Sequence, residues 1–320
     1  KTPNIRKLLF EAFDLNKIVA YSFHVFDEAI VDVLIVEAKK NQPINEQFPV
    51  EIRNDHEVIA TNFFNKWHLR ENYSRHVNIY LSEFASKINQ KLSTLIKLDE
   101  IATITQGTKP FQKGKGKPKQ DEKIMREKPY VKDYRANPTF RPLLRGSLIN
   151  RYKILWDNNY YISFGEWLAE PRFSANYDAP LKIVIRQTGS SLIATLDNNQ
   201  FIVRDNLYTI TSKSEDYSEY LILAALNSKL LNWYYQNIIN NEIGEALAQV
   251  KRGHLAQLPV AKINSFLVNE IIENTKLVLS ELEVNSKRNV QEKLDKIDQL
   301  VYQLYGLTEE EIKMVEESVK

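Results

Sequence analysis

The spacing of apolar residues predicts helices and strands in the N-terminal part of the chain. Apolar side chains between Asn4 and Ile18 recur at roughly helical spacing. The run Ile30–Ala38 is almost continuously apolar and β-branched, which is typical of a strand buried on both faces of an α/β sheet. Two shorter strands and a helix are predicted after it, at Val50–Ile52, Glu57–Ala60 and Leu81–Leu95.

Short apolar runs separated by Gly, Pro and Asn mark the middle of the chain. A strand is predicted at Ile101–Thr105, followed by a glycine turn at Gly107. The stretch Gly107–Gln120 contains three Gly, two Pro and five Lys, so it cannot form a core and predicts a mobile loop. The closely spaced strands that follow indicate a compact β-rich domain, and they are Lys153–Trp156, Lys182–Arg186, Leu192–Leu196 and Phe201–Val203.

Helical spacing returns in the C-terminal third. One long helix is predicted over Tyr217–Ile239. A narrow apolar stripe then runs through Val290, Leu294, Ile297, Val301 and Leu304, alternately three and four residues apart. Gly306 occupies the position of a helix C-cap glycine, and Thr308 with Glu311 predicts a capping box for a last short helix.

The distribution of charge says more than its total. The 320 residues carry a net charge of only +2. Leu98–Tyr161, however, holds 14 Lys or Arg against 7 Asp or Glu, and Ser265–Lys320 holds 7 against 12. A basic middle and an acidic tail indicate a localised anion-binding surface. The absence of Cys and of any long apolar run fits a cytoplasmic protein that does not interact with membranes.

Basic residues in this segment are candidates for contacts with nucleic acid. Flexible lysines beside glycines suit phosphate groups, although an isolated lysine run is equally compatible with a solvated loop. Arginines around the Gly146-Ser147 turn could reach bases or phosphates, or pair with Asp133 or Asp157. Arg and Gln at the end of the strand Lys182–Arg186 could read guanine and adenine, or form only a polar hairpin tip. The candidates from the residues alone are Lys109, Lys113, Lys115, Lys117, Lys119, Arg141, Arg145, Arg151, Arg186 and Gln187.

A group of aromatic residues follows the arginines. Stacking on bases is one possible role, but packing in the core is favoured for most of them. They are Trp156, Tyr160, Tyr161, Phe164 and Trp167.

Catalytic motifs are scarce. The sequence has no Asn/Asp-Pro-Pro-Tyr/Phe turn to hold a flipped base, no glycine-rich strand-to-helix turn for a cofactor, and no metal-ligand spacing among its five His. Asp32, Glu37 and Lys39 resemble the acid and lysine pattern of Mg²⁺-dependent nucleases, with Asp14 or Asp27 as other first acids. The competing interpretation is a core strand that ends in charged residues.

Several strings, in this order, resemble the TaqI-like C-terminal specificity domain of type IIG restriction enzymes and related adenine-specific DNA methyltransferases. The resemblance covers roughly Leu98 to Leu307. Its strings are LDEIATITQG from Leu98, FRPLLRGSLINRY from Phe140, PRF from Pro171, KIVIRQTGSSLIATLD from Lys182, LNSKLLNWYY from Leu226, QLP from Gln257 and LDKIDQLVYQLYGL from Leu294.

The resemblance implies an α+β chain in three parts. Residues 1–97 would be the C-terminal remnant of an α/β methyltransferase sheet with a connector, 98–264 a β-rich mixed target-recognition domain, and 265–320 a C-terminal helical tail. The domain would read double-stranded DNA, with Arg172 added to the contacts above. An N-terminal catalytic domain of the same polypeptide, absent from this chain, would bind S-adenosylmethionine and methylate adenine, and many relatives add an endonuclease domain.

This interpretation predicts a DNA target-recognition module of a restriction–modification system, without catalytic residues or a cofactor of its own. We therefore expect it in the cytoplasm of a bacterium or archaeon. Two alternatives stay open. One is the Mg²⁺-dependent nuclease, and the other is a protein-interaction domain that acts through its tail helices.

Overall fold

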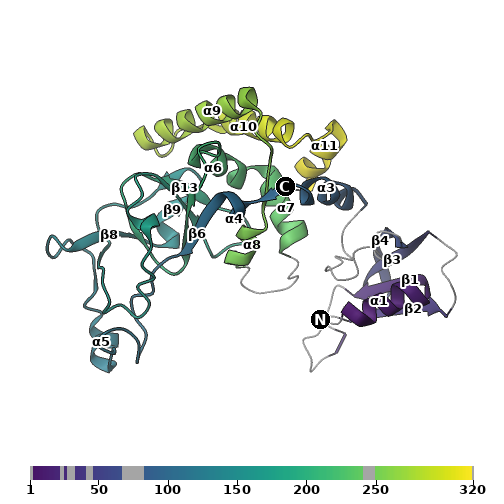
Figure 1. Cartoon of the computed structure of the whole chain (residues 1–320), viewed down its shortest axis with the longest axis horizontal. Helices are drawn as coiled ribbons and strands as arrows, with labels where there is room; N and C mark the ends of the chain where they lie inside the picture. Colours follow the sequence, from purple (N-terminus) through teal and green to yellow (C-terminus); the bar gives the residue numbers. More distant parts are fainter. Residues whose placement is uncertain are drawn as a thin grey trace. The chain divides into compact units, whose positions relative to one another are not determined.

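The chain folds into two compact units. The computed structural model describes residues 3–21, 25–26, 33–40, 46–66, 83–240 and 249–318. Unit 1 is Lys1–Gln90 and unit 2 is Lys91–Lys320. Together they hold several small sheets and a helical C-terminal tail, so the class is mixed α and β (Figure 1). In the described ranges, no helix combines the length and the apolar character needed to cross a membrane.

Unit 1 is built around a four-stranded sheet. Helix α1 (Pro3–Ala12) precedes the strands, and the sheet has the order β2-β1-β3-β4. The β1 strand is parallel to β3, whereas the β1–β2 and β3–β4 pairs are antiparallel. The other elements are β1 (Asp14–Tyr21), β2 (Leu34–Lys39), β3 (Gln47–Asn54), β4 (Glu57–Asn65) and α3 (Glu83–Ser93).

Two predictions for unit 1 were wrong. The helix predicted up to Ile18 ends at Ala12, and the chain continues as β1 in the middle of the sheet. The adjacent residues Ile18, Val19 and Ala20 are all buried there, a pattern that fits an inner strand and not a one-sided helix. The described part of the Ile30–Ala38 run is the edge strand β2, with Leu34 and Ile35 about half exposed. Adjacent side chains point to opposite faces of a strand, so the exposure of both residues shows that neither face of β2 is fully covered there.

Two larger sheets share the core of unit 2. The first has the order β13-β12-β15-β6 and is antiparallel throughout. The second has the order β14-β8-β11-β7, with β14 parallel to β8. Fully buried residues of both sheets, such as Val184 and Leu143, belong to one apolar cluster. The strands are β6 (Ala102–Gln106), β7 (Val131–Lys132), β8 (Phe140–Leu144), β11 (Tyr161–Ser163), β12 (Lys182–Arg186), β13 (Ala194–Asp197), β14 (Ile202–Val203) and β15 (Leu207–Ser212).

Short elements complete the domain. Strand β9 (Ile149–Asn150) pairs with β10 (Lys153–Ile154), and β5 (Ile96–Lys97) pairs with β16 (Pro259–Val260). Helix α4 (Leu98–Ile101) leads into β6, and α5 (Glu122–Glu127) lies away from the tail helices (Figure 1). All the strands predicted for the middle of the chain are therefore present, some shortened by one or two residues.

The predicted helix over Tyr217–Ile239 is interrupted at Ser228. It forms α6 (Glu219–Asn227), α7 (Lys229–Tyr234) and a π-helical turn, Tyr235–Ile239. The Ser228 hydroxyl accepts a hydrogen bond from the backbone N–H of Leu231 at 3.1 Å and so caps α7. The interruption lies between two asparagines that bind the segment around β13. Asn227 bonds both backbone groups of Ala194 at 3.0 Å, and Asn232 accepts from the N–H of Leu192 at 2.8 Å.

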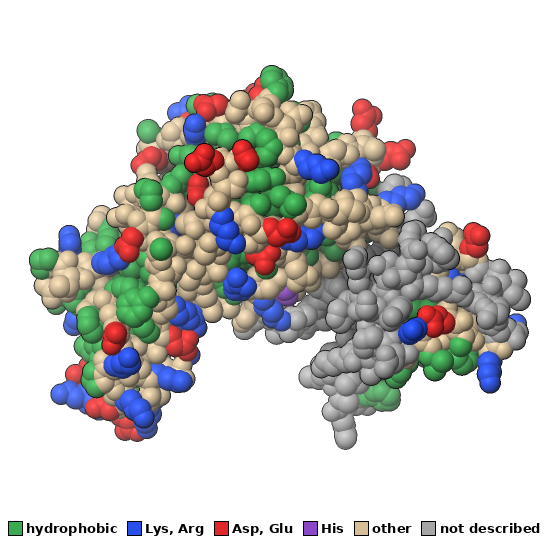
Figure 2. Space-filling view, viewed as in Figure 1, with side chains coloured by type: hydrophobic (Ala, Val, Ile, Leu, Met, Phe, Trp, Pro, Cys, Tyr) green, Lys and Arg blue, Asp and Glu red, His purple; other side chains and the backbone are tan. Residues whose placement is uncertain are grey.

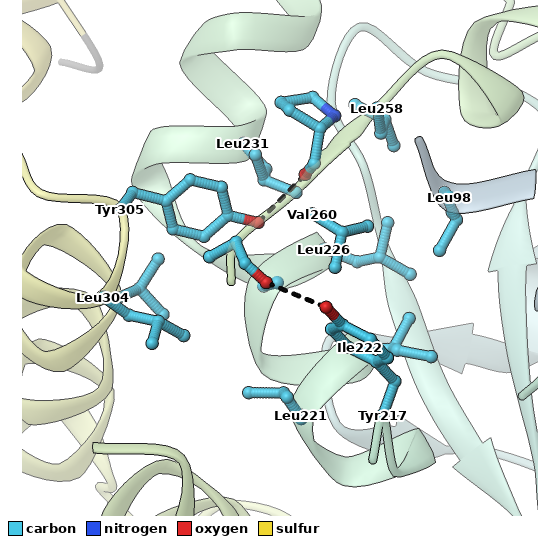
Figure 3. A pocket seen from close by; sticks show the side chains of 14 residues that line it. Leu98, Tyr217, Leu221, Ile222, Leu226, Leu231, Leu258, Val260, Leu304 and Tyr305 are labelled. Carbon is cyan, nitrogen blue, oxygen red and sulfur yellow. Dashed lines mark hydrogen bonds between the residues drawn. The ribbon is translucent and has the colours of Figure 1, made fainter. Parts of the chain in front are cut away.

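Within unit 2, the tail helices pack on the preceding elements through their apolar stripe. Ile297, Leu300 and Val301 of α10 (Gln291–Leu304) are buried. Tyr305 donates to the carbonyl of Pro259 at 3.0 Å beside a cavity of about 20 Å³ (Figure 3). Such a volume holds about one water molecule, so this seam is packing and not a ligand site. The other tail helices are α9 (Ser265–Val284) and α11 (Glu309–Ser318), and the short helix α8 (Arg252–Ala256) precedes the tail.

Both end signals predicted for the tail are confirmed. Gly306 has a φ of +68°, the left-handed conformation expected of a C-cap glycine. The N–H of Thr308 donates to Glu311 at 2.8 Å, and the N–H of Glu311 donates back to the Thr308 hydroxyl at 3.3 Å. Val290, Ile297 and Val301 of the apolar stripe are buried within unit 2, so these three side chains are not available to a separate partner protein.

Candidate nucleic-acid interface

Strands of both sheets in unit 2 end on one side, at the loop Arg204–Asn206. This loop joins the end of β14 to the start of β15, so the ends of β8, β12 and β6 meet it through their pairing. We call this side the strand-end surface. Its segments are Gln106–Lys109, Arg145–Leu148, Gln187–Ser190, Arg204–Asn206 and Gln249–Arg252.

Hydrogen bonds between these segments hold the strand-end surface together. Asn206 accepts from the N–H of Gly146 at 3.3 Å through its side chain and from the N–H of Gln187 at 3.0 Å through its backbone. The carbonyl of Gln187 accepts in turn from the N–H of Val250 at 2.7 Å. Gln106 donates its side-chain amide to the carbonyl of Asp205 at 3.0 Å. Loops with this many mutual bonds present their side chains in defined directions.

Gly107 allows the closest approach within the strand-end surface. Its N–H donates to the carbonyl of Leu207 at 2.9 Å, and a Cβ at this position would lie 2.0 Å from the carbonyl oxygen of Arg204. The N–H of Thr108 then donates to the carbonyl of Val203 at 2.8 Å. Only a residue without a side chain permits this backbone contact. The glycine turn predicted here is therefore a point where two segments touch.

The stretch Gly107–Gln120 is closed by its own hydrogen bonds, in contrast to the mobile loop that was predicted. Two backbone bonds cross it: the N–H of Gly114 donates to the carbonyl of Gln120, and the N–H of Gln120 donates to the carbonyl of Lys115, each at 2.8 Å. The Gln120 side chain is buried and donates to the carbonyls of Pro110 and Trp167 at 2.8 and 2.9 Å. Composition missed this because one buried amide organises the whole turn.

The five lysines of this turn differ in their partners. Lys109 donates to Gln112 at 2.7 Å, Lys113 lies 2.6 Å from Glu122, and Lys117 lies 3.7 Å from Glu166. The ammonium groups of Lys115 and Lys119 are exposed and have no hydrogen bond or ion pair with any described residue. An anion from outside therefore has no carboxylate of the described residues to displace at these two groups. Figure 2 shows basic side chains, with acidic ones among them, gathered on the lobe that contains α5.

Three of the predicted arginines bond to other residues of the chain. They are Arg141, Arg172 and Arg186. Arg141 lies 2.8 Å from Asp178 and donates to the carbonyl of Gln200 at 3.0 Å, so its partner is neither Asp133 nor Asp157. Arg172 pairs with Glu170 and donates to the carbonyl of Gly107 at 2.7 Å. These contacts connect loops that are distant in the sequence, and any DNA contact by these arginines stays a prediction.

Arg186, at the end of β12, donates to the carbonyl of Ile149, and its buried Nε has no hydrogen-bond partner among the described residues. Burial lowers the pKa of its guanidinium. Its neighbour Gln187 is half-buried, and its side-chain amide makes no hydrogen bond within the described ranges. Of this pair, Gln187 is therefore the residue with unused donor and acceptor atoms.

The other two arginines are less constrained. Arg145 is exposed, and its guanidinium carbon lies 5.0 Å from the centre of the Tyr160 ring. Arg151 is half-buried, and no described residue bonds its side chain.

The sequence did not single out Arg204 or Asn206. Arg204 donates to the Tyr160 hydroxyl at 3.1 Å and lies beside Arg145. Both residues lie within three positions after the predicted strand Phe201–Val203, and this position at a strand end is the signal that could have found them.

Most of the aromatic group belongs to the core, as favoured from the sequence. Trp156 packs edge-on against Tyr161 and Phe201, with ring centres 5.3 and 4.9 Å apart. Phe164 and Trp167 also pack against the buried cluster. Tyr160 differs because its ring and its hydroxyl both meet arginines of the strand-end surface.

The nuclease pattern does not come together in the described residues. Asp27 and Asp32 lie outside them. Asp14 is buried and paired with Lys66, whereas Glu37 is exposed and accepts from Asn16 at 3.1 Å. No group of three or more possible metal ligands occurs in the parts of the chain that the structure describes.

Comparison with known proteins places residues 141–260 in a family. They match the model of the TaqI-like C-terminal specificity domain. This segment is a TaqI-like specificity domain. The chain therefore contains a DNA sequence-recognition module of the restriction–modification type, as the ordered strings predicted.

Longer relatives resemble nearly the whole chain. A protein of Methanocaldococcus jannaschii that is named as a type II restriction enzyme and methyltransferase is 25% identical over 324 residues, which are 94% of this chain and 26% of that protein. The type IIL restriction–modification enzyme MmeI was solved in complex with DNA and has a TM-score of 0.50 at 12% identity. The match covers 98% of this chain and 48% of the MmeI chain. The type IIG restriction endonuclease BpuSI has a TM-score of 0.40 at 12% identity, over 95% of this chain and 45% of its own. The chain thus spans about a quarter of its curated relative, and MmeI shares the fold.

Proposed function

We propose that the chain binds double-stranded DNA with the strand-end surface of its specificity domain and with the adjoining turn Gly107–Gln120, and that it reads base sequence at the strand-end surface. One observation carries this proposal. Cations without an acidic partner and an amide with unused donors and acceptors lie on loops that hydrogen bonds hold in place. Phosphate contacts position a protein on the duplex, and polar contacts with base edges specify the sequence. The strand-end surface offers both kinds.

The proposal divides the contacts between two groups of side chains. Lys115, Lys119 and Arg145 would neutralise phosphates, since none of them has an anionic partner among the described residues. Gln187 would face base edges. Both of its backbone groups are bonded, which fixes its Cα, and its free side-chain amide can pair with N6 and N7 of adenine.

In the whole protein, we propose that this module positions the duplex for adenine methylation. Bound S-adenosylmethionine would supply the methyl group. This chain has no Asn/Asp-Pro-Pro-Tyr/Phe turn and no glycine-rich turn for the cofactor. The residues present do not fit the cofactor, so we assign it no step here. We also propose that unit 1 belongs to the methyltransferase sheet, which its parallel β1–β3 pair supports.

Selection from a library of random DNA duplexes tests the proposed function. The whole chain is incubated with the library at moderate salt, and bound duplexes are amplified and sequenced over several rounds. Enrichment of one short motif is expected. Binding without any enriched motif would contradict sequence recognition, and lack of binding at low salt would contradict DNA as the ligand.

Removing the two unpaired lysines should weaken DNA binding at every sequence. We expect Lys115→Ala with Lys119→Ala to lower duplex affinity about tenfold at low salt and to reduce the slope of log affinity against log salt by about 2, one for each lost phosphate contact. Fluorescence anisotropy over a salt series measures both values.

Lys113→Ala with Lys117→Ala is the matched control, because it removes the same charge from the same turn. These lysines already pair with Glu122 and Glu166, so a smaller change in slope is expected. An unchanged slope for the Lys115 and Lys119 variant would exclude these residues from the contact surface.

A further inference from the structure

Arg145 and Arg204 continue two neighbouring parallel strands. Strands β8 and β14 pair with Leu143 opposite Ile202 and Leu144 opposite Val203. The N–H of Arg204 then donates to the carbonyl of Leu144 at 2.9 Å, which extends the ladder by one bond. The next residue of each strand is an arginine, so the two arginines lie side by side where the strands end.

Tyr160 contacts both arginines. It precedes β11, the other neighbour of β8, and its carbonyl accepts from the N–H of Leu143 at 3.0 Å. The Tyr160 hydroxyl accepts from Nη1 of Arg204 at 3.1 Å, and the guanidinium of Arg145 lies over its ring at 5.0 Å. Three adjacent strands thus bring two cations to one aromatic side chain.

One acid compensates this pair in part. Oδ1 of Asp205 lies 3.7 Å from Nε of Arg204, an ion-pair distance that is too long for a hydrogen bond, so two positive charges face one negative charge. The same Nε is buried and lacks a hydrogen-bond partner among the described residues. Arg145 has no acidic partner in the described ranges. Like charges in neighbouring strand positions repel each other, so their placement together suits an anion that binds both.

We propose that Arg145 and Arg204 form a clamp for one phosphodiester group, with Tyr160 as the residue that positions both guanidiniums. The inference rests on the proposed function and deepens it, because it names the anion as a phosphate of the DNA backbone. Arginine suits this role since its planar fork can donate two parallel hydrogen bonds to phosphate oxygens. Asn206 supports the clamp by accepting from the N–H of Gly146, next to Arg145, at 3.3 Å.

The test uses the whole chain and a duplex of arbitrary sequence, with affinity measured over a salt series. The variants are Arg145→Gln, Arg204→Gln and the two combined. Each single change is expected to lower affinity about tenfold at low salt. Because both arginines bind one phosphate, the double variant should lose about 1 in salt slope, whereas two separate phosphate contacts would lose about 2. A loss of about 2, or no loss, would overturn the clamp.

Two further variants separate the clamp from general effects. Tyr160→Phe keeps the ring and removes the hydroxyl that binds Arg204, so affinity should fall while the salt slope stays. Arg288→Gln removes a charge from the tail, where Arg288 lies 3.2 Å from Glu281, and should change neither. The side chain of Arg145 is exposed and makes no hydrogen bond with a described residue, so Arg145→Gln should fold. Even if Arg204→Gln does not fold, an unchanged duplex affinity of Arg145→Gln would overturn the clamp.

This test and the selection experiment can fail independently. A chain that enriches no motif but loses salt slope in the arginine variants would keep the clamp and lose the proposed sequence recognition. A chain that enriches a motif while the arginine variants bind like the wild type would keep the recognition and lose the clamp.

Discussion

Replacement of Lys182 by Met should lower the free energy of unfolding of unit 2 by about 3–5 kcal/mol, the usual result of leaving a buried charge without its partner. Nζ of Lys182 lies 2.6 Å from Oδ2 of Asp197, and both side chains have 0% exposure. The two residues face each other in the β12–β13 pair. Urea unfolding followed by tryptophan fluorescence measures the change, since Trp156, Trp167 and Trp233 all lie in unit 2.

The carboxylate of Asp197 cannot turn away from this site. It accepts from the N–H of Asn199 at 2.7 Å and from the N–H of Phe201 at 3.0 Å. Adding Asp197→Asn to Lys182→Met should therefore recover part of the lost stability, because the buried negative charge disappears while one backbone bond remains possible. A single Lys182→Met variant within about 1 kcal/mol of the wild type would contradict the importance of this pair.

Gly107→Ala should disrupt the strand-end surface and reduce duplex affinity about tenfold or more, in line with an overpacking cost of roughly 1–3 kcal/mol. The added Cβ would lie 2.0 Å from the carbonyl oxygen and 2.5 Å from the carbonyl carbon of Arg204, and 2.5 Å from the carbonyl oxygen of Val203. All three atoms are backbone, so the end of β14 has to move, and Arg204 moves with it. Thermal unfolding and duplex titration measure the two effects.

Gly253→Ala is the matched control for this substitution. Gly253 lies in α8, and no atom lies within 4 Å of the position that its Cβ would take. Alanine favours a helix more than glycine does, so stability should stay equal or rise by about 0.5–1 kcal/mol, with DNA binding unchanged. If the Gly107→Ala variant has the same melting temperature and the same duplex affinity as the Gly253→Ala control, the contact at Gly107 has no role in shaping the strand-end surface.

Local signals predicted much of unit 2. The capping box at Thr308 and the C-cap at Gly306 depend on residues within a few positions of each other, so they can be predicted from the local sequence alone. The strand Lys182–Arg186 is bounded by polar and glycine residues, and its limits match those of β12. The family strings added what no single pattern could, namely that these strands belong to a specificity domain.

Distant contacts explain what the sequence could not predict. The interruption at Ser228 allows Asn227 and Asn232 to bind a strand more than 30 residues away. Arg141 forms an ion pair with Asp178, and this pair cannot be predicted before β8 and the loops after it are placed in space. In unit 1, Leu15 and Ile18 fit a helical period as well as a strand, and only the sheet decides between them.

The placement of free and paired cations is the part of the site that most needed the structure. The twelve lysines and arginines from Lys109 to Arg145 look alike in sequence. Their acidic partners are spread along the chain, and Glu166 for example lies far from Lys117 in sequence. Only after this pairing is known do Lys115, Lys119 and Arg145 stand out as available for phosphate.

Parallel selections with the wild type, Gln187→Ala and Gln303→Ala give the most direct test of sequence reading by the strand-end surface. Gln303 is exposed on α10 and serves as the control. We predict one motif for the wild type, the same motif for Gln303→Ala, and a motif relaxed at one or two adjacent base pairs for Gln187→Ala, since each lost bidentate pair removes about 1–3 kcal/mol of discrimination. An identical, fully retained motif in Gln187→Ala would contradict base reading by Gln187, and no motif in the wild type would contradict sequence reading altogether.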